Sequence, residues 1–282
     1  MKLLRYGPKG QEKPGLLDKA GKLRDLSATI ADINPETLAP AALDRLRKLD
    51  PASLPLVEGS PRFGACLAGV PKMVCVGLNY TDHAKETNSP IPKEPILFMK
   101  ATSSLNGPHD DVMLPKGSQK TDYEVELGIV IGSLARYISL ADARNHVAGY
   151  CVVNDVSERE VQIERGGQWT KGKSADTFCP IGPWLVTAEE VADPGRLALW
   201  TEVNGERRQS SNTGDLIFGV DEIVSYVSQF MTLLPGDVIP TGTPSGVGMG
   251  FKPPKFLKPG DRVRLSVEGL GEQNQRLVAF SG

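Results

Sequence analysis

Short apolar runs, each preceded by a turn signal, predict a chain built mainly from β-strands after residue 69. Runs of five to eight apolar residues bounded by glycine or proline are typical of buried strands. They cover residues 73–78, 96–100, 125–131 and 149–153. Residues 200–208 predict a β-hairpin, because Asn204-Gly205 supplies the pair of positive φ angles that a type I′ turn requires.

One amphipathic helix is predicted over residues 221–234, with Asp221 as its N-cap and Pro235-Gly236 as its stop. The apolar stripe expected on this helix comprises Ile223, Val227, Phe230, Met231 and Leu234. Two Pro-Gly-Asp turns, at 235–237 and 259–261, each precede a predicted strand. Strands do not alternate regularly with long helices, which argues against a doubly wound α/β fold. We therefore expect a β-rich α+β fold.

The first 68 residues have a different pattern from the rest of the chain. Residues 2–6 resemble a strand, residues 16–26 two short strands around Ala20-Gly21, and residues 41–49 a short helix. We expect a small N-terminal domain over residues 1–68 and a catalytic domain over residues 69–282.

Composition and charge exclude several classes of partner. The 282 residues carry a formal net charge of −2, which gives no electrostatic argument for binding nucleic acid or an anionic membrane. No secretory signal pattern and no apolar run of membrane-spanning length is visible, so we expect a cytoplasmic protein. None of the four cysteines has CxxC or zinc-site spacing, and three of them lie in apolar surroundings typical of a core in a reducing compartment.

Three acidic residues carry the strongest chemical signal. Glu124 and Glu126 are two positions apart in a strand-like segment, so their carboxylates point to the same side. Asp155 ends a second apolar run, and the three carboxylates would converge if the two strands were neighbours. Three such charges repel unless a cation lies among them, and ligands that are all oxygen favour Mg²⁺ or Mn²⁺ over Zn²⁺. An acidic, solvent-facing strand is equally consistent with this spacing.

His83 and Glu86 lie three residues apart and therefore on one side of a helical turn. A histidine held by a carboxylate is suited to activating water as a general base. The same spacing also fits the solvated first turn of a surface helix. Their position between a buried strand and a proline-rich stretch is typical of a mobile lid.

Two further segments carry groups suited to an anionic substrate. Lys173 beside a metal site would hold a carboxylate or neutralise an enolate, whereas a Walker A loop is not supported there. The glycine-rich loop 241–250 would bind a carboxylate through its amides and the Thr243 hydroxyl. A tight connection that needs glycine for its turns is the simpler interpretation of that loop.

Taken together, the motifs of residues 70–282 resemble the fumarylacetoacetate hydrolase family. The motifs that carry the resemblance are residues 122–128 (DYEVELG), 154–159 (NDVSER), 172–183 (GKSADTFCPIGP), 209–214 (QSSNTG) and 235–246 (PGDVIPTGTPSG). The resemblance implies a β-rich roll with flanking helices, usually dimeric.

The resemblance also assigns roles to individual residues. It implies Mg²⁺ or Mn²⁺ on Glu124, Glu126 and Asp155. It implies a His83–Glu86 dyad on a closing lid, with Lys173 near the reacting carbonyl. The residues it matches to substrate contacts are Arg159, Gln162 and Thr243, and we expect Lys100 to contact substrate as well.

The family includes hydrolases of 2,4-dioxo acids, decarboxylases, hydratases and isomerases, all of which stabilise an enolate of a metal-chelated 2-oxo acid. The dyad favours hydrolysis of the C3–C4 bond of a 2,4-dioxo acid, either an acylpyruvate or a diketo deoxy sugar acid, to pyruvate and a second carboxylic acid. The alternatives are an oxaloacetate-type decarboxylase and a non-catalytic protein that binds a metal and a 2-oxo acid. We expect a small-molecule substrate and a homodimer or dimer of dimers.

Overall fold

Two β-sheets of nine and five strands form the framework of the molecule, and the computed structural model describes residues 1–281. The large sheet is antiparallel except where β16 pairs with β4. In spatial order its strands are β3 (Leu23–Asp25), β2 (Lys13–Leu17), β1 (Lys2–Tyr6), β13 (Leu185–Thr187), β10 (Val147–Asn154), β9 (Val125–Ile131), β16 (Val238–Pro240), β4 (Met73–Gly77) and β5 (Ile96–Lys100).

The five-stranded sheet contains the predicted hairpin. Its strands are β15 (Glu206–Asn212), β14 (Ala198–Val203), β17 (Arg262–Val267), β18 (Gly271–Val278) and β7 (Val112–Met113). Asn204 and Gly205, which connect β14 to β15, have φ angles of 53° and 81°, as the type I′ turn requires. Two small pairs complete the strands: β8 (Thr121–Asp122) with β11 (Ser157–Glu158), and β6 (Leu105–Asn106) with β12 (Cys179–Pro180).

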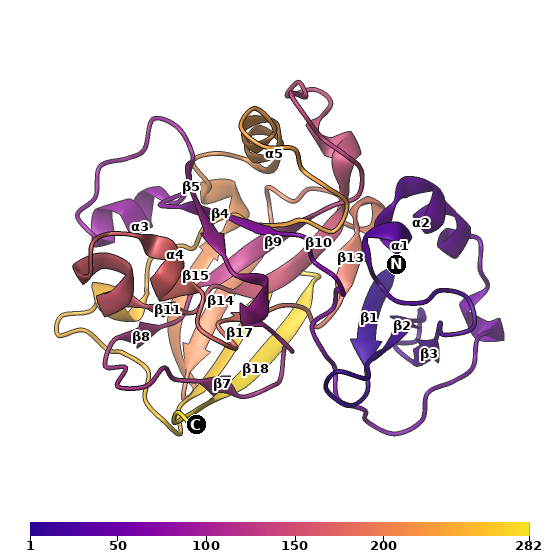
Figure 1. Cartoon of the computed structure of the whole chain (residues 1–282), viewed down its shortest axis with the longest axis horizontal. Helices are drawn as coiled ribbons and strands as arrows, with labels where there is room; N and C mark the ends of the chain where they lie inside the picture. Colours follow the sequence, from indigo (N-terminus) through magenta and orange to yellow (C-terminus); the bar gives the residue numbers. More distant parts are fainter. Residues whose placement is uncertain (282) are drawn as a thin grey trace.

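Helices are short and lie around the sheets (Figure 1). The α-helices are α1 (Pro35–Leu38), α2 (Pro40–Arg47), α3 (Thr81–Glu86), α4 (Trp169–Lys173) and α5 (Val220–Ser228), and η4 (Glu160–Glu164) is a single π-helical turn. The 3₁₀ segments are η1 (Pro51–Ser53), η2 (Thr102–Ser104), η3 (Ala143–His146), η5 (Ala188–Glu190), η6 (Thr213–Asp215) and η7 (Gly248–Gly250). The predicted β-rich α+β class is therefore confirmed.

Strands β9 and β10 are buried on both faces, and the alternation of side chains gives each face its own role. Val125, Leu127 and Ile129 point into the main core, which also contains Leu199 and Leu265 of the five-stranded sheet. The opposite face of β9 carries Val130 in a second core and Glu126 toward the start of the strand. The face of β9 that points away from the main core thus contributes both to the second core and to a charged site.

The N-terminal segment lies at one end of the molecule, opposite α3 and α4 (Figure 1). Its strand β1 pairs with β13, and Leu3 shares the second core with Leu185 and Val153. Arg62 adds an ion pair to Asp110 at 2.5 Å. Residues 1–68 therefore extend the large sheet, and a separate N-terminal domain stays a prediction.

The structure corrects the predicted long helix over 221–234. Helix α5 ends at Ser228, its N-cap is Gly219 rather than Asp221, and Phe230 is 62% exposed instead of packing in the stripe. The backbone of Leu233 exchanges hydrogen bonds of 2.9 and 3.0 Å with Ala135. This pairing is incompatible with continued helix, so the helical periodicity of the sequence overestimates the length of α5.

None of the helices within residues 1–281 has the length and apolar character needed to cross a bilayer.

Candidate active site

Three carboxylates converge where β9 begins and β10 ends. Glu126 of β9 lies opposite Val153 of β10, Glu124 directly precedes β9, and Asp155 directly follows β10. One oxygen from each of Glu124, Glu126 and Asp155 lies within 4.8 Å of the others, and all three residues are buried. Strand alternation places Glu124 and Glu126 on one face, and the pairing of β10 with β9 brings Asp155 to them.

Two buried lysines neutralise part of this cluster. Lys173, at the end of α4, places Nζ 2.5 Å from Glu124 Oε2 and 2.7 Å from Asp155 Oδ2. Lys100, at the end of β5, donates to Asp155 Oδ1 at 2.6 Å, to the carbonyl of Val156 at 3.2 Å and to the carbonyl of Lys173. Lys100 therefore joins Asp155 to the end of helix α4.

A buried arginine connects the cluster to the loop after β16. Arg159 Nη1 lies 2.7 Å from Glu124 Oε1 and 3.0 Å from Gln162 Oε1, and its Nε donates to Asp122 Oδ2 at 2.9 Å. Asp122 in turn accepts hydrogen bonds from the amides of Gly248 and Met249 at 2.6 and 3.0 Å. Arg159 is thereby fixed in orientation and its charge is shared between two carboxylates.

The acids of the cluster differ in pKa. Burial raises the pKa of Glu124, but the charges of Lys173 and Arg159 outweigh burial and hold this pKa at about 2. The pKa of Glu126 is well above its ordinary value, because the residue is buried and faces the charges of Asp155 and Glu124. Without a cation beside it, Glu126 therefore retains a proton more readily than Glu124.

His83 and Glu86 lie on α3 and contact each other across one helical turn. His83 Nδ1 is 3.4 Å from Glu86 Oε2, and His83 is buried rather than solvated. The other Glu86 oxygen accepts the amide of Gly246 at 2.9 Å, and Asp82 accepts the Ser245 hydroxyl at 2.7 Å. These hydrogen bonds thus hold helix α3 against loop 245–250.

The glycine-rich loop binds the acid cluster through its backbone. The Gly242 amide donates to Glu126 Oε2 at 2.8 Å. Gly242 has φ +102°, and a Cβ there would lie 2.8 Å from Asn79 Cβ, so the position requires glycine. The Thr243 hydroxyl donates to the Val125 carbonyl at 2.9 Å and accepts from Gln209 Nε2 at 2.7 Å. The Thr243 hydroxyl therefore already makes two hydrogen bonds within the protein.

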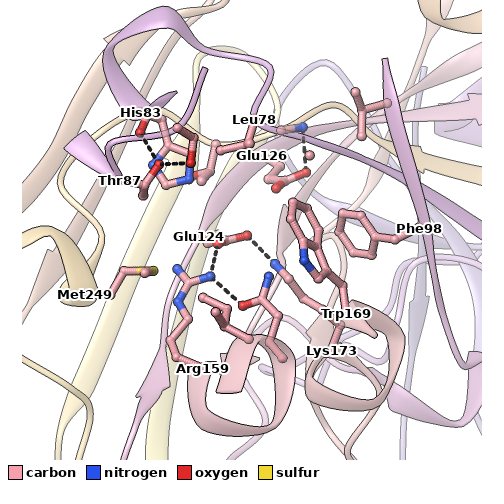
Figure 2. A pocket seen from close by; sticks show the side chains of 17 residues that line it. Leu78, His83, Thr87, Phe98, Glu124, Glu126, Arg159, Trp169, Lys173 and Met249 are labelled. Carbon is pink, nitrogen blue, oxygen red and sulfur yellow. Dashed lines mark hydrogen bonds and ion pairs between the residues drawn. The ribbon is translucent and has the colours of Figure 1, made fainter. Parts of the chain in front are cut away.

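These groups surround one cavity of about 270 Å³ (Figure 2). Glu124 lies between Arg159 and Lys173 at one side of the cavity, with His83 opposite them. Phe98 and Trp169 lie together at another side, across from Met249. Two acids, two cations, His83 and an apolar wall thus face a common space large enough for a small molecule.

Most of the residues predicted for the site line this cavity, and three do not. The lining includes His83, Glu124, Glu126, Arg159, Gln162, Lys173 and Thr243. Lys100 is not in the lining, because its ammonium is occupied by Asp155 and two carbonyls. Glu86 and Asp155 also lie behind the lining residues. The role predicted for Lys100 in contacting substrate stays a prediction that this geometry does not favour.

Sequence reasoning missed the groups that shape the cavity. Asp122 belongs to a recognised motif, but its bond to Arg159 depends on the pairing of β8 with β11. Phe98, Trp169 and Met249 come from β5, α4 and η7, and no spacing in the sequence relates them. Only the tertiary fold brings these side chains together.

The donor set fits a hard divalent cation. Four buried carboxylates, Asp122 and the three of the cluster, face three buried cations, Lys100, Arg159 and Lys173. Within residues 1–281, Glu126 forms no ion pair, and its carboxylate accepts a hydrogen bond from the backbone amide of Gly242. Oxygen donors with excess negative charge suit Mg²⁺ or Mn²⁺, and Glu124, Glu126 and Asp155 are the residues that would hold it.

The sequence profile described as "Fumarylacetoacetate (FAA) hydrolase C-terminal" matches residues 72–278. A curated relative from Burkholderia orbicola (strain MC0-3), named "Putative hydrolase", is 62% identical over 277 residues, which cover 98% of each chain.

Two solved structures share the fold over nearly the whole chain. Fumarylacetoacetate hydrolase from Exiguobacterium antarcticum is 36% identical with a TM-score of 0.87, covering 99% of this chain and 100% of that one. Maleylpyruvate hydrolase from Sphingobium sp. SYK-6, solved in complex with manganese(II) ion and pyruvate, is 27% identical with a TM-score of 0.83 and full coverage of both chains.

Proposed function

Since this chain belongs to the fumarylacetoacetate hydrolase family, we propose that it is a divalent-metal-dependent hydrolase of 2,4-dioxo acids. The reaction adds water across the C3–C4 bond and yields pyruvate and a second carboxylic acid. The observation that carries the proposal is that two acids of the cluster, Glu124 and Glu126, and His83 of the dyad line one cavity. A structural relative crystallised with manganese(II) and pyruvate supports it.

The metal would be held by Glu124, Glu126 and Asp155. Mg²⁺ or Mn²⁺ bound there supplies Lewis-acid polarisation of the oxygens of a 2-oxo acid. The remaining chemistry is assigned to the side chains of the protein.

His83 is the proposed general base. Glu86 Oε2, 3.4 Å away, would accept a hydrogen bond from the Nδ1–H of His83, which leaves Nε2 with its lone pair. Nε2 takes a proton from the water that attacks C4, and Glu86 stabilises the positive charge that the ring then carries. The Gly246 amide fixes Glu86 and so fixes the tautomer.

Lys173 acts as a permanent cation rather than as a nucleophile. Burial lowers its pKa, but the charges of Asp155 and Glu124 outweigh burial and leave this pKa above its ordinary value. A protonated amine forms no Schiff base, so Lys173 is suited to stabilising negative charge on the departing pyruvate. Arg159 donates a hydrogen bond of 3.0 Å to Gln162 Oε1. Both residues line the same cavity and orient the substrate.

The test is a proton NMR time course with acetylpyruvate and, separately, oxaloacetate in Mg²⁺. Hydrolysis predicts equal amounts of pyruvate and acetate from acetylpyruvate, abolished by a chelator and restored by added metal. Turnover of oxaloacetate to pyruvate and CO₂ without cleavage of acetylpyruvate would replace the hydrolase with a decarboxylase.

A further inference from the structure

The cavity has a charged side and an apolar side. Glu124, Arg159 and Lys173 face the space where a 2-oxo carboxylate would bind, on the basis of the proposed function. The apolar lining consists of Val76, Leu78, Phe98, Ile163, Trp169 and Met249. The part of a substrate that extends from C4 away from the acids therefore meets hydrocarbon and aromatic surface.

The two aromatic rings of the wall pack against each other and against β4. Trp169 begins α4, and its ring packs against the edge of Phe98 with centroids 5.4 Å apart at an interplanar angle of 63°. A Cβ at residue 77 would lie 2.3 Å from Trp169 Cζ3, so Gly77 is what allows the indole to lie against β4. An apolar wall packed in this way selects substrates by shape and polarity.

Each cation that lines the cavity already has an anionic partner. Arg159 lies between Asp122 and Glu124, and Lys173 between Glu124 and Asp155. His83 is paired with Glu86. Among the lining residues that the structure describes, no unpaired cation remains for a second, distal carboxylate. Lys173 Nζ lies 5.2 Å from the Phe98 ring centroid but is already paired with Glu124 and Asp155, so a carboxylate against Phe98 and Trp169 would lose hydration with little compensation.

We propose that this cavity selects 2,4-dioxo acids whose C4 substituent is an uncharged alkyl or aryl group. The residues that set this specificity are Phe98, Trp169 and Met249. Ile163 also belongs to the apolar lining, and its side chain is 47% exposed. Substrates that end in a second carboxylate are disfavoured.

A matched pair of substrates tests the proposal. 2,4-Dioxoheptanoate and 2,4-dioxoheptanedioate have the same length and differ only in a terminal methyl or carboxylate. We expect kcat/KM to be at least tenfold higher for the monoacid, since loss of hydration from a buried charge exceeds the gain from a methyl group. Equal or faster cleavage of the diacid would overturn the specificity inference while leaving the hydrolase intact.

Binding provides a readout that does not depend on turnover. The non-cleavable pair 2-oxoheptanoate and 2-oxoheptanedioate is titrated calorimetrically into the Mg²⁺-loaded protein. At least tenfold tighter binding of the monoacid supports the selection, and equal or tighter binding of the diacid rejects it. Failure to cleave acetylpyruvate, by contrast, would reject the proposed function alone.

A substitution at the cavity lining tests which residues select. Ile163→Arg places a cation beside the apolar wall, and Leu56→Arg is the matched control, because Leu56 is 48% exposed and lies outside this cavity. We expect Ile163→Arg to shift the monoacid-to-diacid ratio of kcat/KM at least tenfold toward the diacid. An unchanged ratio in Ile163→Arg, or the same shift in Leu56→Arg, would contradict the assignment.

Discussion

Charge balance among single residues determines what this site can hold. Glu124 is compensated by Lys173 and Arg159, whereas Glu126 is hydrogen-bonded to one amide and lies beside two other carboxylates. The cost of ionising Glu126 is therefore high until a cation binds. We therefore expect protons and a metal ion to compete for the carboxylate of Glu126.

Metal affinity should consequently depend on pH. The pKa of Glu126 is raised, first by burial and then by Asp155 and Glu124, so protons and metal compete for this carboxylate. Affinity for Mn²⁺ should rise by up to about tenfold per pH unit below that pKa and become constant above it. Calorimetric titration in buffers of different ionisation enthalpy should detect the released proton. Glu126→Gln should bind Mn²⁺ weakly and release none, and proton release in that variant would refute this explanation.

The sequence is informative about residues whose geometry is local. Strand alternation predicts that Glu124 and Glu126 share a face, and helical spacing brings His83 to Glu86, as the structure shows. Contacts between distant segments escape this reasoning. The sequence predicts that Lys100 contacts substrate. Its ammonium instead bonds Asp155, 55 residues away, and the carbonyl of Lys173 at the end of α4, 73 residues away.

At the scale of elements, helix α3 and loop 245–250 work as a pair. Asp82 and Glu86 of α3 accept hydrogen bonds from Ser245 and Gly246. Gly250 packs so closely that a Cβ there would lie 2.2 Å from Glu86 Cδ. The loop therefore holds the carboxylate that orients His83, and a change in the loop should alter catalysis without touching the metal ligands.

Gly250→Ala tests this coupling. The added methyl would push the Glu86 carboxylate away from His83 and Gly246, because a flexible side chain moves more easily than backbone. We expect kcat to fall by roughly ten- to a hundredfold, within the range for loss of an oriented base, with Mn²⁺ affinity changed less than twofold. Steady-state kinetics and calorimetry measure the two effects. Gly195→Ala, whose Cβ would approach a flexible carboxylate at 3.2 Å, is the control and should be active.

Strand positions were predictable from the sequence because buried apolar runs and turn residues are local signals. Strands β4, β5, β9 and β10 lie where these runs predict them. Helix α5 was predicted too long, since the pairing of Leu233 with Ala135 competes with helical hydrogen bonds and is invisible in the periodicity. The order of strands in the sheets is likewise set by long-range pairing.

At the scale of the whole molecule, the large sheet joins the N-terminal segment to the site. Strand β1 pairs with β13, β13 with β10, and β10 carries Val153 opposite Glu126. The second core lies along this path and includes residues of both segments. The N-terminal segment thus contributes to the stability of the sheet that positions the acids.

Leu3→Ala should destabilise the whole protein. Leu3 is fully buried in that core, and its loss leaves a cavity at the junction of β1 and β13. We expect the free energy of unfolding to fall by about 2–5 kcal/mol in urea denaturation, with activity per folded molecule unchanged. Leu56→Ala, at a 48% exposed position, should change it by less than about 0.5 kcal/mol. A comparable loss in both variants would contradict a shared core.

The most direct test of the account separates metal binding from proton transfer in the same protein. Mn²⁺ affinity and acetylpyruvate cleavage are measured for the wild type, His83→Ala and Glu126→Ala. The account predicts that His83→Ala lowers kcat by at least about a hundredfold yet binds Mn²⁺ within about twofold of the wild type, whereas Glu126→Ala loses both. Equal loss of metal affinity in the two variants would contradict the division of roles between the acid cluster and the dyad.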